Sequence, residues 1–217
     1  MVSILNSYAV ESPEHGKPFT IDVVEGIDDV HLNYIEKHWR PLIERQYKTA
    51  LLQYFLLPQA SQTEKAFREI LGKLGIPDRH WDWRRKCAVA PGSNRKAYAL
   101  LNGGHVEAVM MLLFGRSSRA GTESLPLIYV DFLAAAPWNR SAIQRPERFR
   151  GMGKMMLGTA VEVSRMNKLD GRCGLHSLAS AEGFYRRIGM QDFGIDSSYY
   201  DMTYFEFDAH SAMAFTS

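Results

Sequence analysis

The sequence lacks the features that define several classes of protein. Its 217 residues include two cysteines, Cys87 and Cys173, which form neither a disulfide framework nor a metal-ligand spacing. The longest apolar runs, 50–57 and 108–114, are far shorter than the ~20 residues of a membrane-spanning helix. Residues 1–5 show no basic region followed by a long apolar one, so no secretory signal is visible. We therefore expect a cytoplasmic globular protein that binds neither membrane nor metal.

The chain also has little net charge, because 26 Lys and Arg residues oppose 24 Asp and Glu residues. The charge is nevertheless unevenly distributed along the chain. Residues 1–139 carry 16 basic and 15 acidic side chains, residues 140–190 carry 10 and 4, and residues 191–217 carry none and 5. A local charge of +6 is typical of a site for an anion, although a solvated basic helix face would give the same pattern.

The N-terminal third has a mainly helical pattern. Residues 1–18 show little periodicity and are predicted to form an irregular arm, whereas the alternation over 19–24 predicts a short strand. An apolar period of helical spacing begins after Asp28 and is broken or restarted by Pro41. A further helix is predicted over 63–74.

The pattern changes near residue 88 to one of strands alternating with helices. Asn102-Gly103-Gly104 lies between two apolar runs and predicts a hairpin turn, since glycine accepts positive φ angles. The predicted elements are strands at 97–101, 105–114, 125–135, 174–178 and 204–207 and helices at 152–166 and 180–188.

The segment that indicates chemistry lies between the strand 125–135 and the helix 152–166. It reads Arg148-Phe149-Arg150-Gly151-Met152-Gly153-Lys154 and is called the glycine loop below. Glycines let a backbone approach a ligand closely, and N–H groups at a helix N-terminus favour an anion. The loop is neither a Walker loop nor a good dinucleotide fingerprint, because Met156 occupies the place of the third glycine. A pyrophosphate site is one interpretation, and ordinary loop glycines are the other.

Together with its neighbours, this loop resembles the GNAT superfamily of acetyl-coenzyme A-dependent N-acetyltransferases. The family combines a strand, an Arg/Gln-x-x-Gly-x-Gly/Ala loop that opens a helix, a second strand, and a helix ending Ala-x-x-Phe-Tyr-x-x-x-Gly-Phe. These parts occur in order at 125–135, 148–153, 174–178 and 181–190, with Met190 in place of the last Phe. The resemblance covers about residues 90–207, and the segments 136–140 and 174–178 look like those of bacterial members.

The resemblance implies a fold and a coenzyme site. The fold would be a mixed α/β single domain over 1–217, with a mostly antiparallel, splayed sheet flanked by helices and an arm, strand and helices before residue 79. Acetyl-CoA would be the co-substrate, and its pantetheine arm would bond to the backbone of Leu133, Ala134 and Ala135. The small alanine side chains suit such an approach, and strand-end packing explains them as well. The pyrophosphate would bind the N–H groups of Arg148, Phe149, Arg150, Gly151, Met152, Gly153 and Lys154.

The implied reaction is attack by an amine on a thioester, which needs a base for the amine and a proton for the thiolate. Tyr185 matches the family's tyrosine on the last helix, and a phenol is protonated at neutral pH. A core aromatic is the alternative for Tyr185. Asp131, in an apolar strand, is one candidate base or a structural ion pair, and His176 is another or a hydrogen-bonded core histidine. Water relays could replace both, and Glu107 is the third candidate.

Three features depart from the family pattern or compete with it. The insertion at 138–147 is either a lid, a contact to the coenzyme's 3′-phosphate through Arg140 or Arg145, or a plain surface loop. Leu178 stands where the family often has asparagine. The aromatic and basic run at 81–86 resembles a nucleic-acid surface, but strand-edge packing is favoured because the overall charge is only +2.

The sequence therefore predicts an N-acetyltransferase that moves an acetyl group from acetyl-CoA to a small-molecule or peptide amine in a ternary complex. Two alternatives stay open: a coenzyme A-binding sensor without catalysis, and an acetyltransferase of a protein or charged tRNA. The modest charge outside 140–190 disfavours a nucleic-acid partner. A two-fold homodimer is the default expectation for the assembly.

Overall fold

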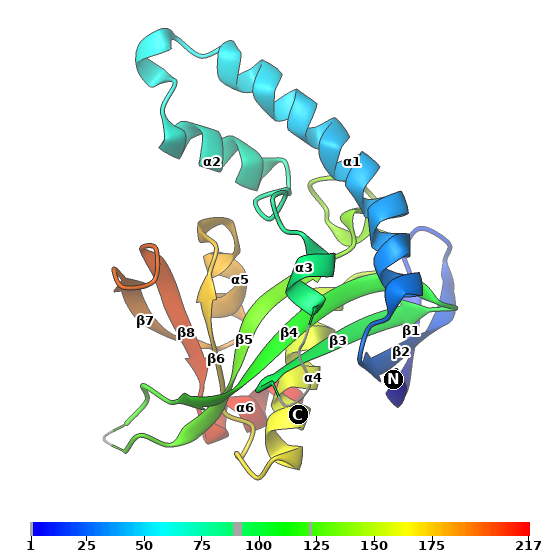
Figure 1. The fold of residues 1–217 in the computed structure, drawn as a ribbon, viewed down its shortest axis with the longest axis vertical. Helices are drawn as coiled ribbons and strands as arrows, with labels where there is room; N and C mark the ends of the chain where they lie inside the picture. The colour runs from blue at the N-terminus through cyan, green and yellow to red at the C-terminus, as the bar shows by residue number, and fades with distance from the viewer. Residues whose placement is uncertain (1, 89–92, 122) are drawn as a thin grey trace. The chain divides into compact units, whose positions relative to one another are not determined.

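The computed structural model describes residues 2–88, 93–121 and 123–217 and shows a mixed α/β fold (Figure 1). The strands are β1 (Ser3–Ser12), β2 (Lys17–Glu25), β3 (Arg95–Asn102), β4 (His105–Ser117), β5 (Pro126–Ala135), β6 (Cys173–Ser177), β7 (Gln191–Asp196) and β8 (Met202–Phe207). The α-helices are α1 (Asp29–Phe55), α2 (Glu64–Lys73), α3 (Trp83–Cys87), α4 (Met152–Met166), α5 (Glu182–Arg187) and α6 (Ala209–Thr216). Short 3-10 turns are η1 (Gln59–Ser61), η2 (Pro137–Asn139) and η3 (Ala179–Ala181).

The strands form a mostly antiparallel sheet with the hydrogen-bonded order β1-β2-β3-β4-β5-β6-β8-β7. The pairs β1–β2, β6–β8 and β7–β8 are antiparallel, whereas β5 and β6 are parallel. This arrangement confirms the fold class expected from the sequence.

The chain divides into two compact units, and the boundary between them falls within β3, β4 and β5 and after the first residue of α4. The first unit comprises Met1–Ala88, Ala99–Ala108 and Ala134–Met152. The second comprises Val89–Tyr98, Val109–Leu133 and Gly153–Ser217. The expected single domain over 1–217 stays a prediction.

In the first unit, the predicted irregular arm over residues 1–18 is wrong, because β1 and β2 form an antiparallel hairpin there. Gly16 turns the chain with a φ of 62°, and its N–H donates to the Ser12 carbonyl at 2.7 Å. The side chains of β1 are mostly exposed, and its register shifts between Ile4 and Asn6. Exposure and the bulge together remove the alternation by which a strand is recognised in a sequence.

The helix expected to break at Pro41 instead runs unbroken over α1. Its N-cap is Asp28, whose carboxylate accepts from the backbone N–H of His31. Pro41 lacks an N–H and so removes one helical hydrogen bond. Buried residues lie on both sides of it, and Trp39 donates its indole N–H to the Val106 carbonyl at 3.1 Å. Tertiary packing thus outweighs the local cost of the proline. Helix α2 lies beside α1 (Figure 1).

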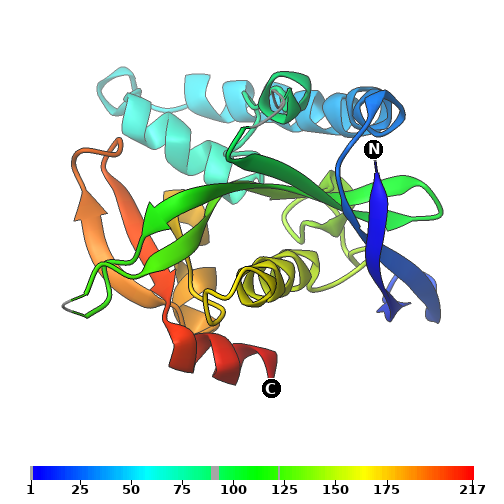
Figure 2. The ribbon, with the colours of Figure 1, turned by 60° about the horizontal axis from the view of Figure 1, so that its bottom comes forward.

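In the second unit, α4 confirms the predicted helix with the predicted bounds, 152–166. One face of α4 is buried, through Met156, Leu157, Ala160 and Val161. Helix α6 lies near α4 (Figure 2), and Ala212 of α6 is close to Val161 around Gly171. Strand β7 and helix α6 were not predicted from the sequence.

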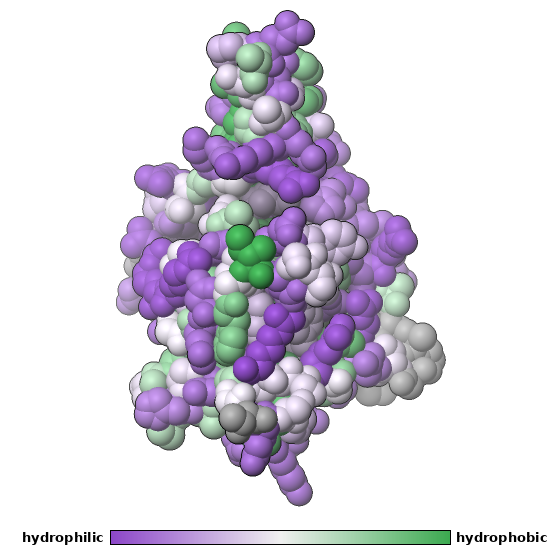
Figure 3. All heavy atoms as spheres, turned by 90° about the vertical axis from the view of Figure 1, so that its left-hand side faces the viewer, coloured by the Kyte–Doolittle hydropathy of each residue, from purple (hydrophilic) through white to green (hydrophobic). Residues whose placement is uncertain are grey.

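No helix of the described residues is long and apolar enough to cross a membrane. The face shown in Figure 3 is mostly hydrophilic, with hydrophobic side chains in small separate groups.

Candidate functional site

The first feature of the site is the point where β5 and β6 stop pairing. Within the described second unit, their parallel register consists of Ile128 opposite Cys173 and Tyr129 opposite Gly174. Strand β5 continues beyond Tyr129 for several residues. Its backbone groups there are consequently available to a partner other than β6.

Next to this point, a chain of hydrogen bonds connects three strands of the second unit. The Tyr129 hydroxyl lies 2.7 Å from His176 Nδ1, and His176 Nε2 lies 3.1 Å from Asp196 Oδ2. Arg119 donates to the same Asp196 oxygen at 2.5 Å. The Tyr199 ring stacks on the imidazole with a centroid distance of 4.0 Å. We call Tyr129, His176, Asp196 and Arg119 the His176 network.

Burial and hydrogen bonds together set the protonation state of this network. Desolvation lowers the pKa of His176, although its hydrogen bond to Asp196 opposes that shift. Hydrogen bonds from Ser198, Arg119 and His176 lower the pKa of Asp196. Burial raises the pKa of Tyr129. At neutral pH the network therefore holds a neutral imidazole between an ionised carboxylate and a protonated phenol. Since the carboxylate only accepts, Nε2 carries the hydrogen and Nδ1 can accept a proton.

Asp131 lies two residues after Tyr129 on β5, so both side chains face the same side of the sheet. Its carboxylate forms an ion pair with Arg95, and its side chain is 6% exposed. The pair compensates the buried charge, which explains a carboxylate within an apolar strand.

Tyr185, on α5, lies on the other face of the sheet. Its ring packs 5.5 Å from that of Phe205, which is opposite Leu175 in the β6–β8 ladder. His176 is opposite Tyr204 in that ladder, so it faces the other way. Burial raises the pKa of Tyr185, which keeps its hydroxyl protonated. The structure thus places the predicted acid and the predicted histidine on opposite faces of one sheet.

The glycine loop is partly anchored within the first unit. The N–H of Arg148 donates to the Trp138 carbonyl at 3.0 Å, and that of Phe149 donates to Asn139 Oδ1 at 2.9 Å. Gly151 has a φ of 78°, and α4 begins at the next residue. The N–H groups of the first turn of a helix have no partners within that helix. The predicted anion site consequently narrows to the N–H groups of residues 150–154.

A buried polar cluster holds the start of this loop, and it consists of Glu107, Trp138, Asn139 and Arg148. Glu107 is fully buried, and its Oε2 accepts from Trp138 Nε1 at 2.6 Å and from Asn139 Nδ2 at 2.8 Å. Its Oε1 lies 3.5 Å from Arg148 Nη1. Burial raises the pKa of Glu107, while these partners oppose the shift. Glu107 was predicted from the sequence only as the third candidate for the general base. A carboxylate inside an apolar run was the available signal for its structural role.

The predicted coenzyme strand end is also engaged. Ala134 is buried, and the carbonyl of Ala135 accepts from Arg140 Nε at 2.8 Å. The Arg140 guanidinium forms two further hydrogen bonds with the Asp78 carboxylate, at 2.6 and 2.8 Å. Of the three predicted strand residues, Leu133 is the one that is neither buried nor bonded to Arg140. The hydrogen bonds to Ala135 and Asp78 hold the Arg140 side chain within the protein.

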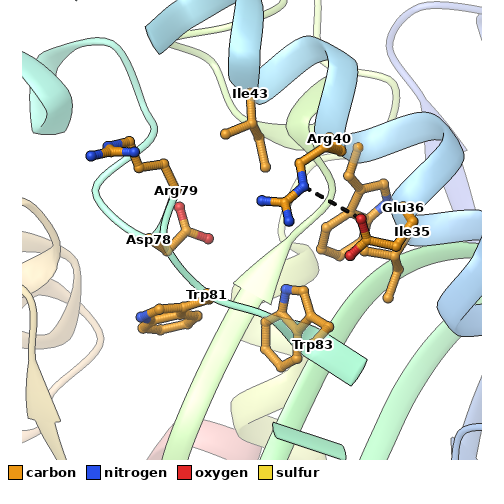
Figure 4. A pocket seen from close by; sticks show the side chains of 9 residues that line it. Ile35, Glu36, Arg40, Ile43, Asp78, Arg79, Trp81 and Trp83 are labelled. Atoms are coloured by element: carbon orange, nitrogen blue, oxygen red, sulfur yellow. Dashed lines mark ion pairs between the residues drawn. The ribbon is translucent and has the colours of Figure 1, made fainter. Parts of the chain in front are cut away.

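The pocket in Figure 4 belongs to the first unit and holds none of the predicted site residues. Arg40 and Glu36, which both line it from α1, form an ion pair at 3.4 Å. Trp83 is buried, and Arg84 bonds to Asp29 at 2.6 Å. Within the run at 81–86, Trp83 is thus engaged in packing and Arg84 in an ion pair. Among the described residues, there is no group of three or more His, Cys, Asp or Glu side chains that could hold a metal ion.

No protein-family model matches the sequence, and no curated protein matches it. Solved structures do match. FeeM, an N-acyl amino acid synthase from uncultured soil microbes, is 9% identical with a TM-score of 0.50 and covers 90% of this chain and 94% of its own. The PaiA N-acetyltransferase of Thermoplasma acidophilum, in complex with coenzyme A, is 13% identical with a TM-score of 0.45, covering 86% and 97%. A protein of Desulfovibrio desulfuricans assigned to the GNAT acetyltransferases is 11% identical with a TM-score of 0.43, covering 86% and 96%.

Proposed function

We propose that this chain, which has the fold of the GNAT acyltransferases, transfers the acetyl group of acetyl-CoA directly to a primary amine in a ternary complex. The observation that carries the proposal is the end of the β5–β6 ladder at Tyr129 and Gly174. It leaves backbone groups of β5 available to an extended, amide-containing ligand such as a pantetheine arm. The fold similarity to an N-acyl amino acid synthase covers 90% of the chain.

The glycine loop supports binding of the coenzyme's pyrophosphate. Residues 150–154 lead into α4 and form its first turn, and the helix dipole favours an anion at that end. A Cβ added at Gly153 would lie 3.8 Å from the Phe184 ring as its nearest contact, so the backbone there is accessible. Lys154 adds positive charge along the same segment, whereas Arg150 pairs with Glu147 at 3.2 Å. Arg148 serves the loop differently, because its backbone groups are bonded within the protein.

The His176 network supports the amine side of the reaction. In the proposed step, the neutral amine nitrogen bonds to the thioester carbonyl carbon and the carbon–sulfur bond breaks. The amine proton passes to the Tyr129 oxygen as the Tyr129 proton moves to His176 Nδ1. Asp196 stabilises the imidazolium that results. Tyr185 lies on the opposite face of the sheet from His176, and in the proposed step it supplies the proton of the coenzyme thiolate through the opening between β5 and β6 where their pairing ends. Asp131 is the weaker base, since Arg95 already pairs with it.

The test is a matched pair of glycine variants on α4. Gly153→Ala and Gly158→Ala each add one methyl group to the same helix, and neither new Cβ would meet an atom closer than 3.8 Å. Both are expected to raise stability slightly, by about 0.5–1 kcal/mol, since alanine favours a helix. Only Gly153→Ala is expected to weaken acetyl-CoA binding, because its methyl lies in the first turn.

Binding is measured by the rise in melting temperature with acetyl-CoA, and turnover by release of free thiol with an amine panel. Weakened acetyl-CoA binding in both variants, or in neither, would refute the proposed binding of the coenzyme by the glycine loop. Saturable binding without turnover on any amine would favour the sensor function instead. No binding at all would refute the assignment.

A further inference from the structure

An exposed arginine lies beside the His176 network. Arg116, near the end of β4, has its guanidinium carbon 5.7 Å from the centroid of the Tyr129 ring. Its charge also contributes to lowering the pKa of His176. Both observations place the guanidinium on the face of the second unit that carries the proposed base.

The carboxylates of this face are already satisfied by other donors. Asp131 pairs with Arg95, and Asp196 pairs with Arg119. Glu206 accepts from the Ser118 hydroxyl, the backbone N–H of Arg119 and the Tyr204 hydroxyl.

Arg116 is therefore left without an ion-pair partner in the part of the second unit that the structure describes. Within residues 93–98, 109–121, 123–133 and 153–217 of the second unit, no carboxylate forms an ion pair with it. The other residues of that unit, 89–92 and 122, contain no carboxylate in their sequence. An exposed guanidinium with five N–H donors thus faces solvent beside a proposed proton acceptor.

This charge restricts which amines suit the site. A primary amine reaches the protein mainly as an ammonium ion, which an uncompensated guanidinium repels. A diamine or a lysine side chain would gain nothing from Arg116. A carboxylate beside the amine offsets this repulsion, because a guanidinium binds a carboxylate through two parallel hydrogen bonds.

We infer that the acceptor is an amine bearing a carboxylate, an amino acid, and that Arg116 binds that carboxylate while the His176 network takes the proton of the amine. This inference rests on the proposed function. Arg119 cannot take the same role, because it is held by Asp196 at 2.5 Å and lies over the Tyr204 ring at 4.1 Å.

The experiment compares three sets of acceptors with acetyl-CoA: common α-amino acids, their carboxamides, and linear diamines. The enzyme is used as wild type, Arg116→Ala, Arg116→Lys and the control Arg187→Ala, which removes another exposed arginine of the second unit. Thiol release gives kcat and KM for each acceptor. The melting-temperature shift with acetyl-CoA is measured for every variant.

We expect wild type to prefer an amino acid to its carboxamide. Arg116→Ala should raise KM for the amino acid about 10- to 100-fold with little change in kcat, and leave the carboxamide unaffected. Arg116→Lys should restore part of the loss, and Arg187→Ala should behave as wild type. Equal losses on the amino acid and the carboxamide, or a preference for diamines or carboxamides, would overturn the inference while leaving acetyl transfer intact. Coenzyme binding without transfer to any amine would overturn both.

Discussion

Replacing Glu107 tests whether the buried polar cluster holds the start of the glycine loop. Glu107→Ala removes the acceptor of the Trp138 and Asn139 N–H groups, at 2.6 and 2.8 Å, and the partner of Arg148 at 3.5 Å. Breaking a buried charge pair from one side costs about 3–5 kcal/mol, because the remaining charge is left unpaired.

Glu107→Gln is the milder change. It keeps the shape and one acceptor but loses the charge, and we expect it to cost about 1–3 kcal/mol. For a chain of this size, each kcal/mol lowers the melting temperature by about 2–4 °C. The alanine variant should therefore melt about 6–20 °C below wild type, and the glutamine variant about 2–12 °C below it.

Glu64→Gln is the control, because it makes the same chemical change in a side chain that is 78% exposed. Its effect should stay below about 1 kcal/mol. Unfolding is followed by denaturant and by heat, and acetyl-CoA affinity is measured on the same samples. If Glu107→Gln and Glu64→Gln are equally stable and bind acetyl-CoA equally well, the anchoring role of Glu107 is wrong.

The pH dependence gives a second measurement on the same variants. Burial raises the pKa of Glu107 in the folded protein above its ordinary value. The folded state then binds the proton more tightly than the unfolded state does. That contribution to stability is fully present below the ordinary glutamate pKa of about 4.3 and is lost as pH rises through the raised pKa. The stability difference between wild type and Glu107→Gln should accordingly narrow as pH rises from about 4.3. A stability difference that widens over this range would contradict the raised pKa of Glu107.

Three further changes have expected outcomes. Gly174→Ala would place a Cβ 2.9 Å from Tyr204 Cζ and should cost about 1–3 kcal/mol in a denaturant titration; unchanged stability would mean that the ring moves freely. Asp196→Asn removes a group that raises the pKa of His176, so kcat should fall about 100-fold and the acid limb of kcat/KM should move to lower pH; a shift to higher pH would contradict the network. Tyr185→Phe keeps the aromatic packing and should lower kcat about 100-fold with coenzyme affinity retained, whereas an unchanged kcat would exclude it as the proton donor.

Local signals in the sequence predicted the elements whose structure depends on nearby residues. Helix α4 has the predicted bounds because its apolar face and its flanking glycines both lie within the segment. The β3–β4 hairpin follows from its glycine turn, in which Gly103 and Gly104 have φ angles of 54° and 84°. Strand β1 was missed because its side chains are mostly exposed and its register shifts. The break predicted at Pro41 is wrong because α1 packs against the rest of its unit on both sides of the proline, and this packing outweighs the proline's local cost.

In the site, too, the sequence indicates individual side chains but not the distant residues that they contact. Asp131, His176 and Tyr185 could be named from the sequence because each is a chemically distinct side chain in an apolar setting or a motif. Their partners could not be named, since Asp196 lies 20 residues beyond His176 and Tyr129 lies 47 before it. No periodicity or spacing relates residues that only the sheet brings together.

Ser12 has a consequence for how the chain acquires its coenzyme loop. Its buried hydroxyl donates to the Arg148 carbonyl at 2.7 Å across 136 residues of sequence. A contact of such long range forms only after most of the chain has been synthesised and its first hairpin has docked. A chain with its first strand missing or displaced would carry the glycine loop without this restraint. Coenzyme affinity would then report whether the N-terminal hairpin had reached its place during folding.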